Sequence, residues 1–202
     1  MEAIDTFEVG KYKVEIHVDE DPIDPRTDCD NDDVMVCFHK RYCLGDKHNY
    51  KMDDFNSWDE LEAQIIKDHD PVVIKPIYMY DHSGLTIATT PFSCKWDSGQ
   101  IGYIFISKKE AYKSHMVKRI TKKIKETCEK NIESSVNVYD EYLSGESYGY
   151  IIKDETDEEV ESCWGFFGLD YVKKEAKTIA EYLVNQPPKE NPNQMKLALE
   201  NT

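Results

Sequence analysis

Residues 80–104 read YDHSGLTIATTPFSCKWDSGQIGYI, and this stretch predicts how the middle of the chain folds. Two apolar runs, Leu85–Thr90 and Ile101–Ile106, are typical of β-strands. Between them lies a loop rich in polar and aromatic residues, and an Asp-His-Ser step at 81–83 precedes the first run. Because loops held by rigid strands commonly carry binding and catalytic residues, this stretch marks a candidate site.

On both sides of this stretch, the hydrophobic pattern of the chain predicts an α+β fold. Alternating or apolar runs indicate further strands at 11–18, 34–39, 72–80, 148–152 and 160–167. Capping boxes at Ser57/Glu60 and Ser107/Glu110 start two helices, over 57–68 and 107–143, and Asp170 is expected to cap a third. We expect a mostly antiparallel sheet of about six or seven strands, with three helices, one of them long, packed on one face. Pro76 requires an edge position or a bulge.

Length and composition predict a single domain over residues 1–185 and a loosely ordered polar tail over 186–202. The chain has no apolar run near the length of a bilayer span, and its first residues lack a signal-peptide pattern. Its six cysteines have no framework spacing and are expected to be reduced thiols. The expected location is therefore the cytoplasm.

The net charge of −15 argues against direct nucleic-acid binding through a broad basic face. It favours either simple solubility or imitation of an acidic polymer that occupies a partner's basic groove. The charge is uneven: residues 108–130 contain nine basic residues and three glutamates, a net charge of +6, which leaves −21 elsewhere. The expected role of these basic residues is a solvated helix face.

Three residues could form a nucleophilic site. A thiolate nucleophile needs an imidazole within hydrogen-bond reach and a carboxylate that orients it, and Cys94, His82 and Asp97 supply these groups. They would make the protein a small hydrolase or transferase. The alternative is structural, with Cys94 buried beside Trp96 and Asp97 bonded to backbone amides in a turn. No nucleophile signature is present, so a non-enzymatic role is favoured over an enzyme.

Two segments resemble metal sites only loosely. Cys37, His39, Cys43 and His48 offer sulfur and nitrogen ligands, but their spacing matches no standard zinc module. The acidic segment at 28–33 begins like a calcium loop yet lacks the glycine at its sixth position and the glutamate at its twelfth, which excludes an EF-hand. No cofactor is expected, and a loosely bound divalent ion is the remaining alternative.

The segment around Arg41 and the loop of residues 81–100 are each connected to strands of one predicted sheet. We therefore expect their side chains to meet in one pocket, with Arg41 and Trp96 on the same side. Arginine is scarce, three against 22 lysines, so each one is expected to have a dedicated partner, which for Arg41 could be Asp46 or the acidic loop. The candidate binding residues are His39, Arg41, Asp81, His82, Trp96, Asp97, Ser98 and Gln100. Such a pocket could also serve a small-molecule sensor or sponge.

Two segments, FHKRYCLGDKH at 38–48 and YDHSGLTIATTPFSCKWDSGQIG at 80–102, resemble a family of small phage and mobile-element proteins. The resemblance covers roughly residues 11–170. Family members carry Trp-Asp-Asn-Leu-Gly before the first motif, where this chain has Cys-Asp-Asn-Asp-Asp at 29–33. The family implies no catalytic role. It implies a phage accessory protein that binds and modulates or inhibits a host protein, such as a defence factor of the CRISPR or restriction type or a nucleic-acid-processing factor. The expected location of such a protein is the cytoplasm of the host cell.

Overall fold

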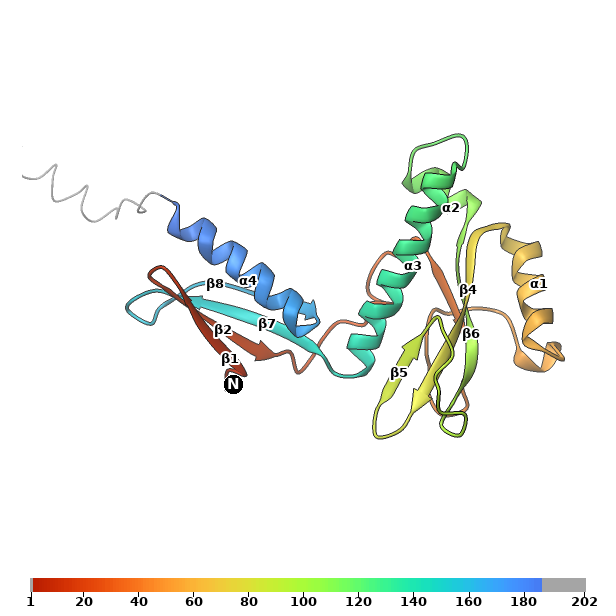
Figure 1. Ribbon diagram of the computed structural model, residues 1–202, viewed down its shortest axis with the longest axis horizontal. Helices are drawn as coiled ribbons and strands as arrows, with labels where there is room; N and C mark the ends of the chain where they lie inside the picture. Colours follow the sequence, from red (N-terminus) through yellow and green to blue (C-terminus); the bar gives the residue numbers. More distant parts are fainter. Residues whose placement is uncertain (1, 187–202) are drawn as a thin grey trace, which may run out of the picture. The chain divides into compact units, whose positions relative to one another are not determined.

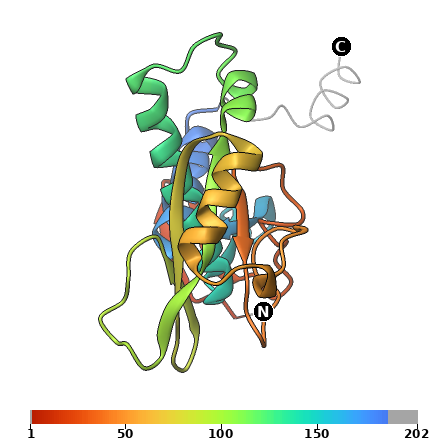
Figure 2. The same ribbon diagram turned by 90° about the vertical axis from the view of Figure 1, so that its right-hand side faces the viewer.

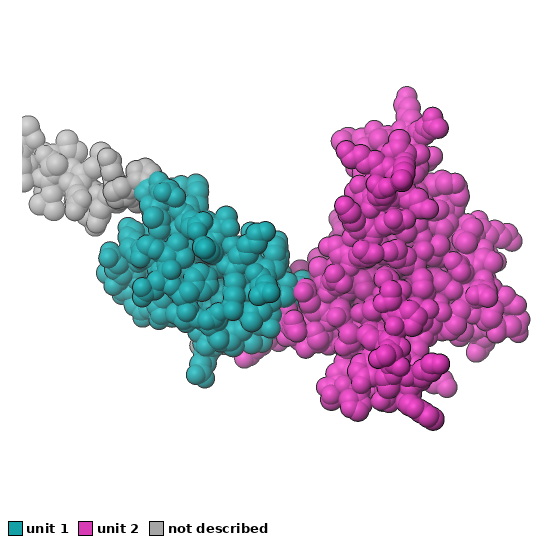
Figure 3. Space-filling model, viewed as in Figure 1, with its two compact units in different colours: residues 1–19, 148–202 teal, residues 20–147 magenta. Residues whose placement is uncertain are grey.

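The computed structural model describes residues 2–186 and shows an α+β protein. In the described chain, eight strands form two antiparallel four-stranded sheets, accompanied by four α-helices. The chain divides into two compact units (Figure 3). Residues 20–147 form the central unit, and residues 1–19 with 148–202 form the split unit. The prediction of one sheet with six or seven strands and three helices is therefore corrected. Residues 1–185, expected to be one domain, contribute to two units.

The central unit is a sheet with helices on both faces. Its strands are β3 (Val34–Cys37), β4 (Pro71–Asp81), β5 (Leu85–Ala88) and β6 (Ser98–Ser107), in the order β3-β6-β4-β5. Its helices are α1 (Trp58–His69), α2 (Lys108–Ser114) and α3 (Lys122–Leu143), with a short 3₁₀ turn at Met52–Asp54. Helix α1 covers one face and α3 the other (Figures 1 and 2). The expectation of helices on one face only was wrong, because β6 is buried on both sides.

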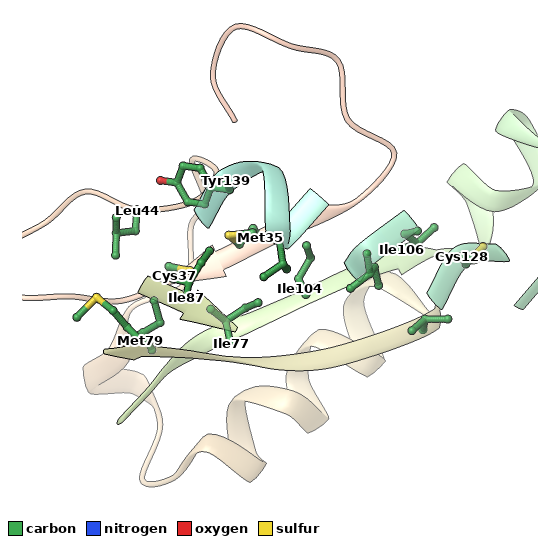
Figure 4. Packing of buried hydrophobic residues seen from close by; sticks show 14 of the residues in the cluster. Met35, Cys37, Leu44, Ile77, Met79, Ile87, Ile104, Ile106, Cys128 and Tyr139 are labelled. Carbon is green, nitrogen blue, oxygen red and sulfur yellow. The ribbon is translucent and has the colours of Figure 1, made fainter. Parts of the chain in front are cut away.

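Two hydrophobic clusters hold these layers together. On the α3 face, Ile77 and Ile104 of the sheet pack with Cys128, Ile132 and Val136 of the helix (Figure 4). On the α1 face, a second cluster contains Leu61 and Ile65 of the helix with Val36, Tyr103 and Phe105 of the strands. The sheet is thus fixed from both sides, and the loops that leave its strands start from a rigid frame.

Strand β4 is central although it contains Pro76. The proline pairs with Tyr103 of β6, and a register shift follows between Ile77 and Tyr78. The proline required either an edge strand or a bulge. Because β4 is an inner strand, the bulge next to the proline is what accommodates it. Both capping boxes are confirmed at their serines: the Ser57 and Ser107 hydroxyls accept the Glu60 and Glu110 amides.

The single long helix expected over 107–143 is two helices. Met116 has a left-handed backbone (φ 50°) and is 91% exposed, so it cannot belong to a continuous buried stripe. A new helix starts where the Thr121 hydroxyl accepts the Ile124 amide at 3.3 Å. Thr121 is the kind of residue that caps the start of a helix, but it lies within a continuous apolar repeat, which obscured this signal in the sequence.

The split unit consists of two hairpins and one helix. Its strands are β1 (Asp5–Val9), β2 (Tyr12–Val18), β7 (Ser147–Lys153) and β8 (Glu159–Phe167), in the order β1-β2-β7-β8. Helix α4 (Leu169–Val184) packs through Val172, Ala176 and Ala180 on Val14, Ile16 and Ile152. The predicted hairpin of β7 and β8 is confirmed, whereas β1 was not predicted. Helix α4 begins after Gly168, so Asp170 lies in its first turn and does not cap it. The predicted loose tail lies, apart from its first residue, outside the described residues.

Replacing Gly102 with alanine is expected to destabilise the central unit by about 1–3 kcal/mol or more. A Cβ at this position would lie 1.9 Å from the Val36 carbonyl oxygen and 2.9 Å from the Cys37 Cα, so the backbone of β3 would have to move. The control is Gly99→Ala on the same strand, where a Cβ meets nothing within 4 Å. Urea denaturation measures both variants. Equal midpoints for the two would contradict the close packing of β3 on β6.

Candidate functional site

Residues 38–48 and 96–101 line a common pocket in the central unit with a volume of about 1240 Å³. Both Arg41 and Trp96 belong to its lining, together with Asp81. The prediction that the two motif segments converge is therefore confirmed. They converge because β3, which precedes the first segment, and β4, which precedes the second, both pair with β6. The pocket is also lined by Met52, Trp58 and Met79, which were not predicted as site residues from the sequence.

An ion pair joins the two segments directly. The Arg41 Nη2 donates to the Asp81 Oδ2, so the dedicated partner of this arginine is Asp81. The Arg41 side chain is 67% exposed and that of Asp81 21%. The Nδ1 of His39 accepts the backbone amides of Arg41 and Tyr42, each at 3.3 Å. The His39 ring also stacks on the Tyr42 ring at 4.9 Å between centroids. His39 thus shapes the turn that presents Arg41.

The second segment is closed by its own hydrogen bonds. The Asp81 amide donates to the Asp97 carbonyl at 2.8 Å, and the Ser98 hydroxyl donates to the Cys94 carbonyl. The Gln100 side chain donates to the Gly102 carbonyl at 3.3 Å, which commits one of its amide hydrogens to the strand. Ser98 and Gln100 therefore have structural roles in the loop. Trp96 in this loop is 96% exposed.

The nucleophile candidates meet, but not in the order that covalent catalysis requires. The Asp97 Oδ2 lies 3.3 Å from the His82 Nδ1 and 3.9 Å from the Cys94 Sγ. The carboxylate thus stands between thiol and imidazole, whereas a nucleophilic thiol needs the imidazole as its immediate base. The side chains of His82 and Asp97 are 65% and 42% exposed. The structural alternative is not confirmed either: Trp96 is exposed, Cys94 is only partly buried, and, within the described part of the chain, the Asp97 carboxylate contacts the side chains of Cys94 and His82, not the backbone amides that were expected.

The proposed metal ligands do not form a cluster. No group of three or more His, Cys, Asp or Glu side chains among the described residues is placed to hold a metal ion. Cys37 lies in the core, where burial raises the pKa of its thiol to about 12, and a zinc ligand must be a thiolate. The His48 Nε2 lies 3.0 Å from the Cys37 carbonyl, the His39 Nδ1 accepts backbone amides, and the Cys43 thiol is exposed.

A buried ion network centred on Arg26 holds Asp46 of the first segment in place, and it was not predicted from the sequence. Arg26 Nη1 donates to the Asp33 Oδ1 at 2.7 Å, and its other nitrogens donate to the Asp46 carboxylate at 2.5 and 3.1 Å. Asp46 also accepts the Met35 amide at 2.6 Å, and Asp33 accepts the Ser135 hydroxyl at 2.6 Å. The scarcity of arginine indicated dedicated partners, but the partner of Arg26 could not be read from spacing.

Within the described chain, no helix has both the length and the apolar character needed to cross a membrane. Comparison of the sequence with protein-family models gives no match, and neither the curated proteins nor the solved structures contain a significant relative.

Proposed function

We propose that the protein is a phage-type accessory protein that binds a host protein and modulates or inhibits it. The expected host partners are a defence factor, of the CRISPR or restriction type, or a nucleic-acid-processing factor. The pocket formed by residues 38–48 and 96–101 is the proposed contact surface, with Trp96 as its anchor. The proposed phage context comes from the motif resemblance. The proposed mode of binding is inferred from the geometry of the pocket.

The exposure of Trp96 is the observation that carries this proposal. Trp96 is 96% exposed at a pocket, whereas the other two tryptophans are partly covered. An unpartnered tryptophan leaves a large apolar surface in water, and tryptophan is enriched among residues that dominate binding energy at protein interfaces. Arginine is also enriched among the residues that dominate binding energy at interfaces. Arg41 lines the same pocket, and most of its side chain is exposed.

The dimensions of the pocket favour a protein segment over a small molecule. Its volume of about 1240 Å³ exceeds the roughly 300–1,000 Å³ of typical small-molecule sites. Its lining is mixed, with aromatic and sulfur-containing side chains beside several charged ones. A folded loop or an extended segment of a partner can fill such a site and cover Trp96 at once.

The acidic surface is a second contributor to the proposal. The exposed carboxylates of Glu20, Asp30 and Asp32, and of Glu155 and Glu158, are available for long-range attraction of a basic partner. Asp33 does not belong to this set, because it is buried against Arg26. An attraction of this kind weakens as salt rises.

Trp96→Ala is expected to weaken capture of the host partner by about 30-fold or more, corresponding to about 2 kcal/mol for an anchor residue. The experiment compares affinity capture from host lysate, read by quantitative mass spectrometry, for the wild type, Trp96→Ala and Tyr182→Ala. Tyr182 is a matched control, an aromatic residue 62% exposed on α4 that is not part of the pocket lining. A parallel series of washes at rising salt tests the acidic surface.

A host protein lost with Trp96→Ala and kept with Tyr182→Ala supports the proposal. Binding that survives Trp96→Ala, or is lost equally with Tyr182→Ala, would remove the pocket as the contact surface. Retention that does not change with salt would remove the acidic contribution while leaving the anchor in place.

A further inference from the structure

The segment of residues 108–130, which we call the basic arm, is the one strongly basic region of this acidic chain. It comprises α2, the connection to α3 and the first part of α3. In the central unit, the connection between the two helices projects beyond the ends of the strands (Figures 1 and 2). The connection is therefore presented away from the strands, whereas Ala111 of α2 and Cys128 of α3 anchor the two ends of the basic arm in the core cluster of the sheet.

Most of the cations of the basic arm are not used by the fold. Three of its nine basic residues form ion pairs: Lys108 with Asp70, Lys113 with Glu110, and Lys122 with Glu126. The charges of Asp30 and Asp32 also act on Lys113. The other six are exposed and have no ion-pair partner among the described residues; they are Lys109, Lys118, Arg119, Lys123, Lys125 and Lys130.

Some cations of the basic arm, paired and free, occupy positions that oppose helix stability. Lys122, Lys123 and Lys125 lie in the first turn of α3 or directly after it, and the first turn contains no acidic residue. The N-terminal end of a helix carries a partial positive charge that favours acidic side chains and disfavours lysine. Solubility does not explain them either, because they bring the net charge of an acidic protein closer to zero. A bound polyanion would account for their placement.

We propose that the basic arm binds the sugar-phosphate backbone of nucleic acid. Nucleic acid carries a regular, dense row of charges, so one strand can neutralise all six free cations without a dedicated carboxylate opposite each. Lysine suits this role because its ammonium group contacts phosphate as a point charge without strict geometry. The −21 carried by the rest of the chain repels the same polyanion. Contact is thereby confined to the basic arm and the protein is oriented on the nucleic acid.

This proposal goes beyond the host-protein binding described above, because it concerns a different surface and contains none of the pocket residues. It is also compatible with the expectation that the protein does not bind nucleic acid through a broad basic face, since the proposed contact is limited to the basic arm. Sequence specificity is not expected, because contacts with phosphate do not read bases.

The test is fluorescence anisotropy of labelled DNA, as a short duplex and as a single strand, titrated with the full chain at several salt concentrations. For the wild type, the logarithm of the association constant should fall linearly as the logarithm of the salt concentration rises. The slope is about −5 if all six free cations contact phosphate, and shallower if fewer do. The test variant combines Lys118→Gln, Arg119→Gln and Lys123→Gln. We expect about tenfold weaker binding or more, and a slope of about −2 to −3.

The control variant combines Lys51→Gln, Lys67→Gln and Lys174→Gln, which removes the same charge from exposed lysines outside the basic arm. It should bind DNA nearly as the wild type does. Melting curves of both variants verify that these surface changes leave the fold intact. No DNA binding by the wild type at low salt, or equal losses in the two variants, would overturn the proposal.

Polyglutamate, titrated as an unlabelled competitor, separates nucleic acid from an acidic protein partner. If it displaces DNA at equal or lower charge concentration, the basic arm fits an acidic protein segment, and the nucleic-acid proposal is overturned. Because Trp96 is unchanged in both variants, this result does not depend on the outcome of the host-protein capture.

Discussion

Arg26→Leu is expected to destabilise the central unit by about 3–5 kcal/mol. The Arg26 side chain is 1% exposed, and its two carboxylate partners, Asp33 and Asp46, are 3% and 19% exposed. Burial alone would disfavour the guanidinium cation, but the hydrogen bonds and charges of Asp46 and Asp33 outweigh it, so the pKa of Arg26 is raised. Leucine would leave two carboxylates facing each other without their cation. An uncompensated buried charge is among the most destabilising changes in a protein.

Hydrogen exchange read by mass spectrometry on β6 peptides reports this loss in the central unit, and urea denaturation gives its size. The matched control is Arg119→Leu, because Arg119 is exposed and has no ion pair within the described chain. It should change stability by no more than about 0.5 kcal/mol. A similar small effect for Arg26→Leu would show that the acidic segment is not held by this network. Because Asp46 also lines the pocket, the same variant should weaken host-protein capture.

The local parts of the fold could be predicted because their signals are local. The capping serines at 57 and 107 and the alternation of Tyr12, Val14 and Ile16 each depend on neighbours within a few residues. The convergence of the two motif segments also followed from their attachment to strands. The division of 107–143 into two helices did not follow. Met116 continues the apolar period by residue type, and only its left-handed backbone and its exposure break the pattern.

The long-range parts could not be predicted, because no local signal specifies which strands share a sheet. The split unit is formed by segments more than a hundred residues apart, in which Ile16 of β2 pairs with Tyr150 of β7. Similarly, Arg26, Asp33 and Asp46 lie in polar segments whose composition is typical of solvated loops. Their burial depends on the packing of the loop against the sheet and α3. The order thiol, carboxylate, imidazole at Cys94, Asp97 and His82 is likewise a matter of loop geometry.

Glu15→Gln is expected to remove about 2–3 kcal/mol from the stability of the split unit at neutral pH and almost nothing at pH about 2. Glu15 is 8% exposed on β2. Its carboxylate accepts from Lys13 at 2.6 Å and from Lys153 at 2.9 Å, and His17 lies at 3.5 Å. The hydrogen bonds of Lys13 and Lys153 lower the pKa of Glu15 to about 2, against the opposing effect of burial.

The sign of the pH dependence follows from this lowered pKa. In the unfolded chain Glu15 releases its proton near pH 4.5, and in the folded chain near pH 2. Above pH 4.5 both states are ionised, and the folded state retains the full stabilisation from the two ammonium groups. As pH falls from 4.5 towards 2, the unfolded state takes up the proton first, so the stabilisation is lost progressively. Glutamine keeps the shape of the side chain but not its charge, and the difference between wild type and variant should therefore close across this window.

Urea denaturation at a series of pH values, with hydrogen exchange read on β2 and β7 peptides, measures that difference. The control is Glu161→Gln on β8, because Glu161 is exposed and forms no ion pair with any described residue. It should change stability by less than about 0.5 kcal/mol at every pH. Asp5 and Asp154 of the same unit also have lowered pKa values, caused mainly by hydrogen bonds from Lys173 and Thr156 respectively, so the wild type and both variants all lose stability in acid. Only the difference between the wild type and Glu15→Gln isolates Glu15. A difference that stays constant from pH 7 to about 2 would contradict a contribution from the charge of this carboxylate.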